Sequence, residues 1–155
     1  GTGMPSRLFQ EIREKRGLVY SIMSGNIFFE DAGIFGIIAG TGDNKIKELI
    51  PVLCDELINS PKNLSEEEIL KAKAKLKFSL VKSLESCRSN AGSCADDLLN
   101  YNRIIKVEEQ LEKINKVSKE SIQKVVTQML SSNPTIASIG PIKNLEKLEN
   151  LRSRF

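Results

Sequence analysis

Residues 6–21 read SRLFQEIREKRGLVYS, and the hydrophobic pattern of this stretch changes at Gly17. Before the glycine, Leu8, Phe9 and Ile12 recur at the spacing of one helical face. After it, the chain carries β-branched and aromatic residues, which are typical of a strand. Glycine commonly ends a helix because it adopts the left-handed conformation without steric cost. The stretch therefore predicts a helix that ends at Gly17 and leads directly into a strand.

The strand that starts after Gly17 is predicted to pair with the next one along the chain. We expect the first strand over residues 18–29, with an irregularity at Gly25 and Asn26, and the second over residues 34–39. The residues between them, EDAG, have the composition of a turn. A short turn between two strands predicts an antiparallel hairpin.

Beyond the hairpin, helical spacing of apolar residues dominates the sequence. A first helix should begin at Asp43 or Asn44 and kink or restart at Pro51, because proline cannot donate to the helical hydrogen-bond ladder. Ser65 and Glu68 have the spacing of a capping box, which predicts the start of the longest helix. Further helices are expected at about 91–101, after a break at 86–93, and at 107–114, 118–130 and 145–151.

Residues 135–139, TIASI, predict a third strand between Pro134 and the turn at Gly140. The order of elements is then helix, hairpin, several helices, strand and helix. This order is typical of the α+β class, here a two-layer domain with a mostly antiparallel sheet and long helices packed on one face. At 155 residues, the chain has the length of a single domain, residues 1–155.

Composition excludes several classes of function. The net charge of +3 is small, basic and acidic residues are interleaved, and there are no Trp and two Tyr, so we expect no nucleic-acid partner. No apolar run approaches the roughly 18 residues of a membrane span. The chain contains no histidine, which excludes a Ser-His or Cys-His nucleophile and leaves no ligand set for a catalytic zinc.

Three cysteines, Cys54, Cys87 and Cys94, form no pairing pattern typical of disulfides or zinc knuckles. We therefore expect free thiols and a reducing compartment such as the cytoplasm or the mitochondrial matrix.

Two side chains near Gly17 have the chemistry of a carbonyl-binding pair. Arg13 lies at the flank of the apolar helix face, and Tyr20 follows three residues after the glycine. A guanidinium and a phenol that converge at the helix–strand junction could both donate hydrogen bonds to an oxygen gaining negative charge. From spacing alone, an ordinary surface Arg and a half-buried Tyr explain the same residues.

At these residues the sequence resembles the C-terminal-half motif of the pitrilysin-like zinc proteases, which include mitochondrial processing peptidase. The resemblance covers nearly the whole chain in the family's order. It is carried by residues 6–21, EDAGIFG at 30–36, SEEEI at 65–69, KAKLK at 73–77, LES at 84–86 and IGP at 139–141.

The resemblance implies that Arg13 and Tyr20 bind the substrate carbonyl next to the scissile bond, with Arg16 as a second-ranked cation. It also implies a metalloendopeptidase for peptides or presequences, whose zinc is bound by a His-x-x-Glu-His motif in the N-terminal half. Nothing here matches that motif, so this chain alone should be inactive and hold no zinc. Since it also lacks an initiator Met, we expect the trailing part of a longer protein.

The same resemblance leaves two alternatives open. The chain could belong to a non-zinc partner subunit that supplies Arg13 and Tyr20 to a separate zinc-bearing subunit. It could also be a non-catalytic structural relative, like the core subunits of a respiratory complex. In relatives, upstream strands complete the sheet, so an exposed sheet edge and self-association through it are expected here.

Overall fold

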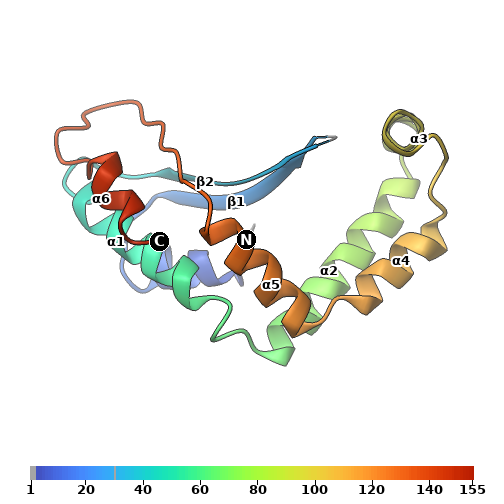
Figure 1. Ribbon diagram of the computed structural model, residues 1–155, viewed down its shortest axis with the longest axis horizontal. Helices are drawn as coiled ribbons and strands as arrows, with labels where there is room; N and C mark the ends of the chain where they lie inside the picture. The colour runs from blue at the N-terminus through green and yellow to red at the C-terminus, as the bar shows by residue number, and fades with distance from the viewer. Residues whose placement is uncertain (1–2, 30) are drawn as a thin grey trace. The chain divides into compact units, whose positions relative to one another are not determined.

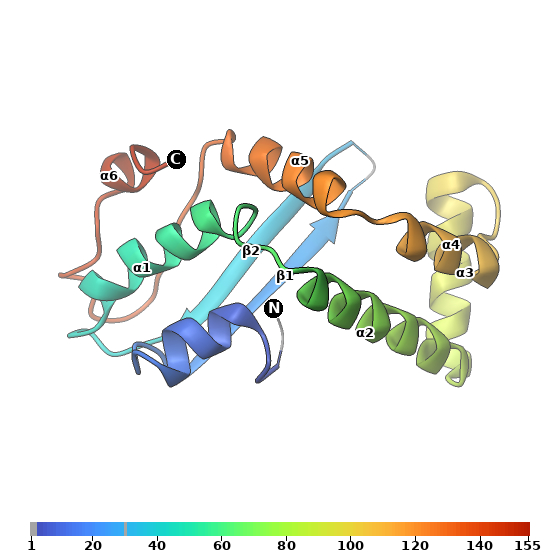
Figure 2. The same cartoon turned by 90° about the horizontal axis from the view of Figure 1, so that it is seen from below.

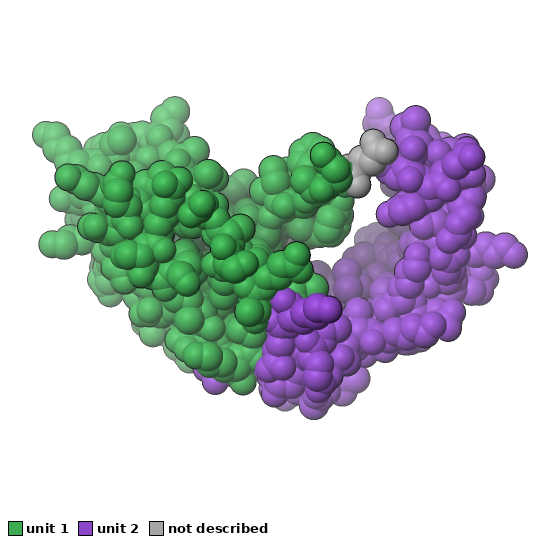
Figure 3. Space-filling view, viewed as in Figure 1, with its two compact units in different colours: residues 1–62, 125–155 green, residues 63–124 purple. Residues whose placement is uncertain are grey.

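A computed structural model describes residues 3–29 and 31–155 of the chain. The contacts divide the chain into two units, which Figure 3 shows in different colours. Unit 1 consists of Gly1–Lys62 and Val125–Phe155, and unit 2 of Asn63–Lys124. The single-domain assignment of residues 1–155 stays a prediction.

Unit 1 is built around a β-hairpin and the helices that surround its base (Figure 1). Its elements are η1 (Phe9–Glu14), β1 (Ser21–Phe28), β2 (Gly33–Gly40), α1 (Ile46–Asn59) and α6 (Leu148–Arg152).

The first helix, η1, contains the wider turns of a π-helix, in which the backbone N–H of Lys15 donates to the carbonyl oxygen of Gln10 at 3.0 Å. It ends as predicted, because Gly17 has a φ of +59°. The N–H groups of Gly17 and Leu18 then donate back to the carbonyls of Arg13 and Ile12. The strand follows, although its ladder begins at Ser21 and not at residue 18.

The hairpin is antiparallel, with Ser21 opposite Gly40 and Phe28 opposite Gly33. The predicted irregularity at Gly25 and Asn26 is wrong, because these residues pair in regular register with Gly36 and Phe35. Two glycines opposite each other leave the ladder intact, since its hydrogen bonds need only the backbone.

One face of the hairpin packs on η1 and α1, which Figures 1 and 2 show on the same side of the two strands. Ile22 and Ser24 point into this layer and are buried. The core consists of Leu8, Phe9, Ile12, Leu18, Val19, Ile22 and Leu49, with Ile37, Ala39, Val52 and Leu53 packed against it. The residues that surround Gly17 in sequence therefore form most of the core.

Two details of α1 differ from the prediction. Neither Asp43 nor Asn44 is the N-cap; Lys45 occupies that position without a side-chain cap. The helix also continues through Pro51 without restarting. Proline removes a single N–H from the ladder, and the half-buried residues on both sides of Pro51 remain packed in unit 1.

The third predicted strand, residues 135–139, is wrong. The sheet among the described residues has two strands, β1 and β2, and residues 133–139 carry no strand assignment. A strand is defined by its hydrogen-bonded partner, and no described residue pairs with this segment. Its composition is that of a strand, but Ile139 is fully exposed and Ile136 is half-buried, so the apolar residues of the segment are not packed as in a sheet.

Unit 2 is helical and contains α2 (Glu66–Leu84), α3 (Cys87–Tyr101) and α4 (Val107–Lys116). The predicted capping box is confirmed: Ser65 Oγ accepts from the N–H of Glu68 at 3.2 Å, and the Ser65 N–H donates to Glu68 Oε2 at 2.9 Å. Helix α2 packs against α3 and α4, and the Lys73 ammonium donates to the Asn115 carbonyl of α4 at 2.9 Å.

The predicted break at residues 86–93 is shorter than expected. Ser86 is the N-cap of α3, and its Oγ accepts from the N–H of Ser89 at 3.3 Å, so the small polar residues form the first turns of the helix. Helix α5 (Lys119–Leu130) spans the boundary between the units, and Ser118 caps it through the N–H of Ser121 at 3.2 Å, as predicted.

The α+β class with an antiparallel sheet is confirmed. Within residues 3–29 and 31–155, no helix combines the length and the apolar character that crossing a bilayer requires.

Candidate substrate-binding site

Arg13 lies on the exposed side of η1, next to the core but not in it. Its guanidinium lies over the ring of Phe9, with 4.6 Å between Cζ and the ring centroid. No described acidic residue forms an ion pair with Arg13. The side chain therefore presents a cation without an acidic partner, and its guanidinium stacks on an aromatic ring.

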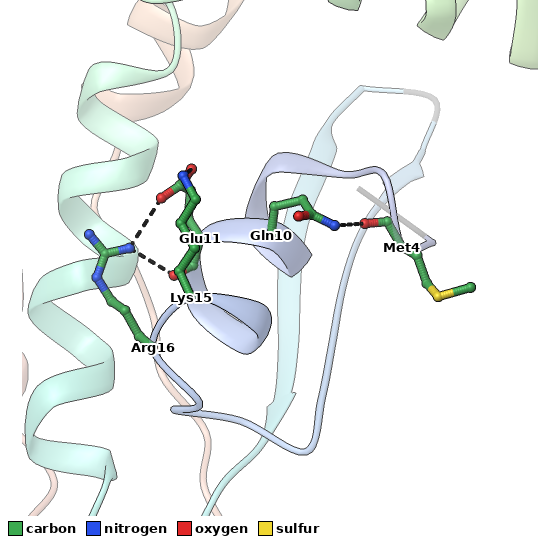
Figure 4. A network of polar contacts seen from close by, with 5 residues as sticks. All are labelled: Met4, Gln10, Glu11, Lys15 and Arg16. Carbon is green, nitrogen blue, oxygen red and sulfur yellow. Dashed lines mark hydrogen bonds and ion pairs between the residues drawn. The ribbon is translucent and has the colours of Figure 1, made fainter.

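Arg16, the second-ranked cation, is bound to its own helix (Figure 4). Its Nη1 donates to the Glu11 backbone carbonyl at 2.7 Å and lies 3.3 Å from Glu11 Oε2. Lys15 Nζ contacts the other carboxylate oxygen of Glu11 at 2.6 Å. These contacts, the hydrogen bond from Lys15 first, lower the pKa of Glu11. Arg16 thus stabilises the end of η1, which supports Arg13 as the better substrate-binding candidate.

Tyr20 occupies the entry to β1, and 77% of it is exposed, more than the half-buried ring that spacing alone suggested. Its backbone is held in place: the Tyr20 N–H donates to the Gly40 carbonyl at 2.7 Å, and Thr41 Oγ1 donates to the Leu18 carbonyl at 2.6 Å. A Cβ at position 42 would lie 3.7 Å from the Tyr20 hydroxyl, so the phenol lies beside the turn at Gly42. The ring is accessible while its backbone is fixed.

Arg13 and Tyr20 therefore project from consecutive elements, joined through Gly17 and the buried pair Leu18 and Val19. The side chains of Arg13 and Tyr20 make no hydrogen bond with each other among the described residues. Both are donors, and both keep this capacity unused within the described chain. Such an arrangement can bind an oxygen acceptor that comes from another molecule.

No metal centre accompanies this pair in the part of the chain that the structure describes. No group of three or more His, Cys, Asp or Glu side chains there could hold a metal ion. The three cysteines are free thiols; Cys54 is buried in unit 1, and this burial raises its pKa. The donor set of this chain does not fit zinc.

Comparisons with known proteins identify the family. Residues 1–76 match the family model described as the peptidase M16 inactive domain. The chain is 34% identical over 145 residues to an uncharacterized zinc protease of Streptomyces coelicolor, covering 93% of this chain and 32% of that protein. It is 30% identical over 146 residues to one of Bacillus subtilis, covering 94% and 36%. The chain thus spans about a third of the length of these relatives.

Two solved structures share the fold. A chain of complex III2 from Candida albicans with Inz-5 bound has a TM-score of 0.84 at 21% identity, over 97% of this chain and 38% of that chain. A conserved protein from Enterococcus faecalis V583 has a TM-score of 0.71 at 24% identity, over 83% and 30%. The chain belongs to the pitrilysin-like M16 family of zinc proteases and corresponds to its C-terminal part.

Sequence reasoning proposed Arg13 and Tyr20 as site residues but did not predict the residues that surround them. The spacing of Phe9 and Arg13, four residues apart on one helix, was a visible signal for their contact. Thr41 and Gly42 gave no such signal, because their proximity to Leu18 and Tyr20 depends on the register of the hairpin.

Proposed function

We propose that this chain is the substrate-holding part of a zinc metalloendopeptidase that cleaves peptides or presequences. In this proposal Arg13 and Tyr20 donate hydrogen bonds to the carbonyl oxygen next to the scissile bond. The observation that carries it is the exposure of two unused donors on consecutive, firmly anchored elements. The names of the curated relatives support the peptidase class.

The chemistry of peptide cleavage explains why these donors are useful. As the carbonyl carbon is attacked, its oxygen gains negative charge, and donors that are already in place stabilise that charge without reorganisation. The guanidinium of Arg13 adds a full positive charge, and the phenol of Tyr20 adds a neutral donor. Both contacts then strengthen towards the transition state, which is the condition for raising kcat.

The metal must come from residues outside this sequence, because the donor set here does not fit zinc. An N-terminal half of the same polypeptide or a separate subunit would supply it. The role proposed for this chain is therefore to bind and orient the substrate, and the metal is held elsewhere.

A partner subunit without zinc, or a structural subunit of the core type, is the second candidate. The similarity of the fold to a chain of complex III2 is compatible with this second candidate, but at 21% identity the similarity concerns the fold alone. The accessible Arg13 and Tyr20 favour the peptidase, since a structural role has no use for two donors facing outward. A His-x-x-Glu-His motif elsewhere in the same protein would favour the peptidase, and its absence would favour the subunit without zinc.

Reconstitution tests whether this chain binds the substrate while a separate zinc-bearing part supplies the metal. The purified chain is expected to bind no stoichiometric zinc and to cleave no peptide, because it lacks imidazole ligands. Mixing it with the zinc-bearing part of its parent enzyme should produce cleavage that neither part shows alone. Metal analysis that finds one tightly bound zinc per isolated chain would overturn the proposal, as would a mixture that stays inactive although its parts associate.

The isolated chain is also proposed to self-associate through the hairpin. A two-stranded sheet leaves one unpaired edge on each strand, and such edges pair with other strands. The distal half of the hairpin is exposed and apolar, with Ile27, Phe28, Ile34 and Phe35 among its accessible residues. Sedimentation at increasing concentration should show growing oligomers, whereas a monomer at every concentration would contradict this.

A further inference from the structure

Phe9 connects the core of unit 1 with the proposed substrate-binding site. Only 8% of the residue is exposed, and it packs with Leu8 and Ile12 in the buried cluster. The guanidinium of Arg13 lies over its ring at 4.6 Å from the centroid. The ring thus belongs to the rigid interior while it contacts the cation expected to bind substrate.

Phe9 and Arg13 lie four residues apart in the π-helical segment η1. In an α-helix, with 3.6 residues per turn, residue i+4 lies past residue i around the axis. A π-helix has more residues per turn, so residue i+4 falls short of a full turn instead, and side chains four residues apart remain neighbours. The hydrogen bond from Lys15 N–H to the Gln10 carbonyl, at 3.0 Å, closes one of these wider turns around Arg13.

The ion pairs on η1 do not involve Arg13, whose guanidinium contacts the ring of Phe9. Glu11 is the acidic side chain nearest to it in sequence that forms ion pairs, and its carboxylate is bound by Lys15 at 2.6 Å and by Arg16 at 3.3 Å. A carboxylate partner would fix the guanidinium but would also neutralise its charge. An aromatic face orients the group and leaves its N–H donors free for an acceptor.

We propose that Phe9 is a positioning residue for Arg13, whose aromatic ring holds the guanidinium in the orientation that receives the substrate carbonyl. This inference rests on the proposed function of Arg13. It gives Phe9, a residue of the buried core, a role in substrate binding through Arg13. An aromatic side chain is then required at position 9, and apolar volume alone is insufficient.

Substitutions in the intact zinc enzyme test this requirement. Phe9→Leu keeps an apolar side chain in the core but removes the ring, and should lower kcat/KM about threefold to tenfold, since small errors in orientation slow the reaction. Phe9→Tyr keeps the ring and should remain within about twofold of wild type. Leu8→Val is the matched control: it perturbs the same core without touching Arg13 and should also stay within about twofold.

A double-mutant cycle separates positioning from general loosening of the core. In an Arg13→Ala background, Phe9→Leu should cause no further loss of kcat/KM, because the group that Phe9 orients is gone. An equal loss in both backgrounds would overturn the inference. If Arg13→Ala lowers turnover and Phe9→Leu does not, this inference fails alone; if Arg13→Ala itself has no effect, the proposed function fails.

A spectroscopic measurement on the isolated chain tests the contact without activity. Protons of the Arg13 side chain over the ring should be shifted upfield in the NMR spectrum of the wild type and of Phe9→Tyr. The shift should disappear in Phe9→Leu. Arg13 resonances at ordinary positions in the wild-type chain would overturn the proposal.

Discussion

The two units of this chain differ in how they are held together. Nine of the ten buried hydrophobic residues lie in unit 1, and Ile69 of α2 is the one in unit 2, counted over residues 3–29 and 31–155. Large apolar side chains of unit 2, such as Phe78 and Leu99, are instead exposed. Burial of apolar surface is the main force in folding, so unit 1 should be the more stable part.

Unit 2 relies on local interactions along and between its helices. Arg103 forms a bidentate ion pair with Glu109, with both distances at 2.7 Å, and Lys113 contacts the same carboxylate at 3.0 Å. The hydrogen bond from Arg103, followed by that from Lys113, lowers the pKa of Glu109 to about 2. Exposed pairs of this kind contribute little to stability.

The difference shows why the candidate site belongs to unit 1. Arg13 and Tyr20 need fixed backbones if they are to meet one carbonyl oxygen, and rigid elements position such groups better than loosely packed ones. The elements that carry them enclose Ile12, Leu18 and Val19, which are among the buried residues. Unit 2 offers no comparable support among its described residues.

The largest expected effect on stability comes from the core of unit 1. Ile12 of η1 is completely buried in the core of unit 1, so Ile12→Ala should lower the free energy of unfolding by about 2–5 kcal/mol. Urea denaturation of the purified chain at low concentration measures this change.

The matched substitution in unit 2 is Leu99→Ala in α3, at a residue that is 84% exposed. Its effect should stay within about 0.5 kcal/mol, as for surface substitutions in general. Equal losses of unfolding free energy for Ile12→Ala and Leu99→Ala would show that the two units are packed alike, which would contradict the difference proposed between them.

A smaller effect is expected from the capping box of α2. Ser65→Ala removes the oxygen that accepts from the Glu68 N–H and should cost about 1 kcal/mol. Ser65→Asp restores an acceptor and should recover most of that loss. Amide hydrogen exchange should show the change in the first turns of α2 and leave η1 unaffected; faster exchange throughout unit 1 would contradict the local character of the cap.

The sequence predicted the elements whose signals are local. The turn at Gly17, the capping box at Ser65 and the cap at Ser118 depend on residues within a few positions, and all three are confirmed. The candidate residues Arg13 and Tyr20 came from a motif on adjacent elements. Their exposure agrees with a binding role, which stays a proposal.

Apart from the cap of α1, where a local signal at Asp43 and Asn44 failed, the main failures concern features that local pattern does not determine. Residues 135–139 have the composition of a strand, yet a strand exists only where another strand pairs with it. The predicted irregularity at Gly25 ignored that glycines can pair across a regular ladder. The contact of Thr41 with Leu18 depends on the hairpin register, which composition alone does not give.

The most direct test of the account is the turnover of the intact zinc enzyme with its two donors removed in turn. Arg13→Ala and Tyr20→Phe should each lower kcat by about 10²–10³, roughly 2.7–4 kcal/mol, while folding and zinc content stay normal. Arg13→Lys should not restore turnover, because an ammonium lacks the planar fork. Arg16→Ala should be milder, since Arg16 is bound to Glu11. Near-wild-type turnover in both Arg13→Ala and Tyr20→Phe would contradict the account.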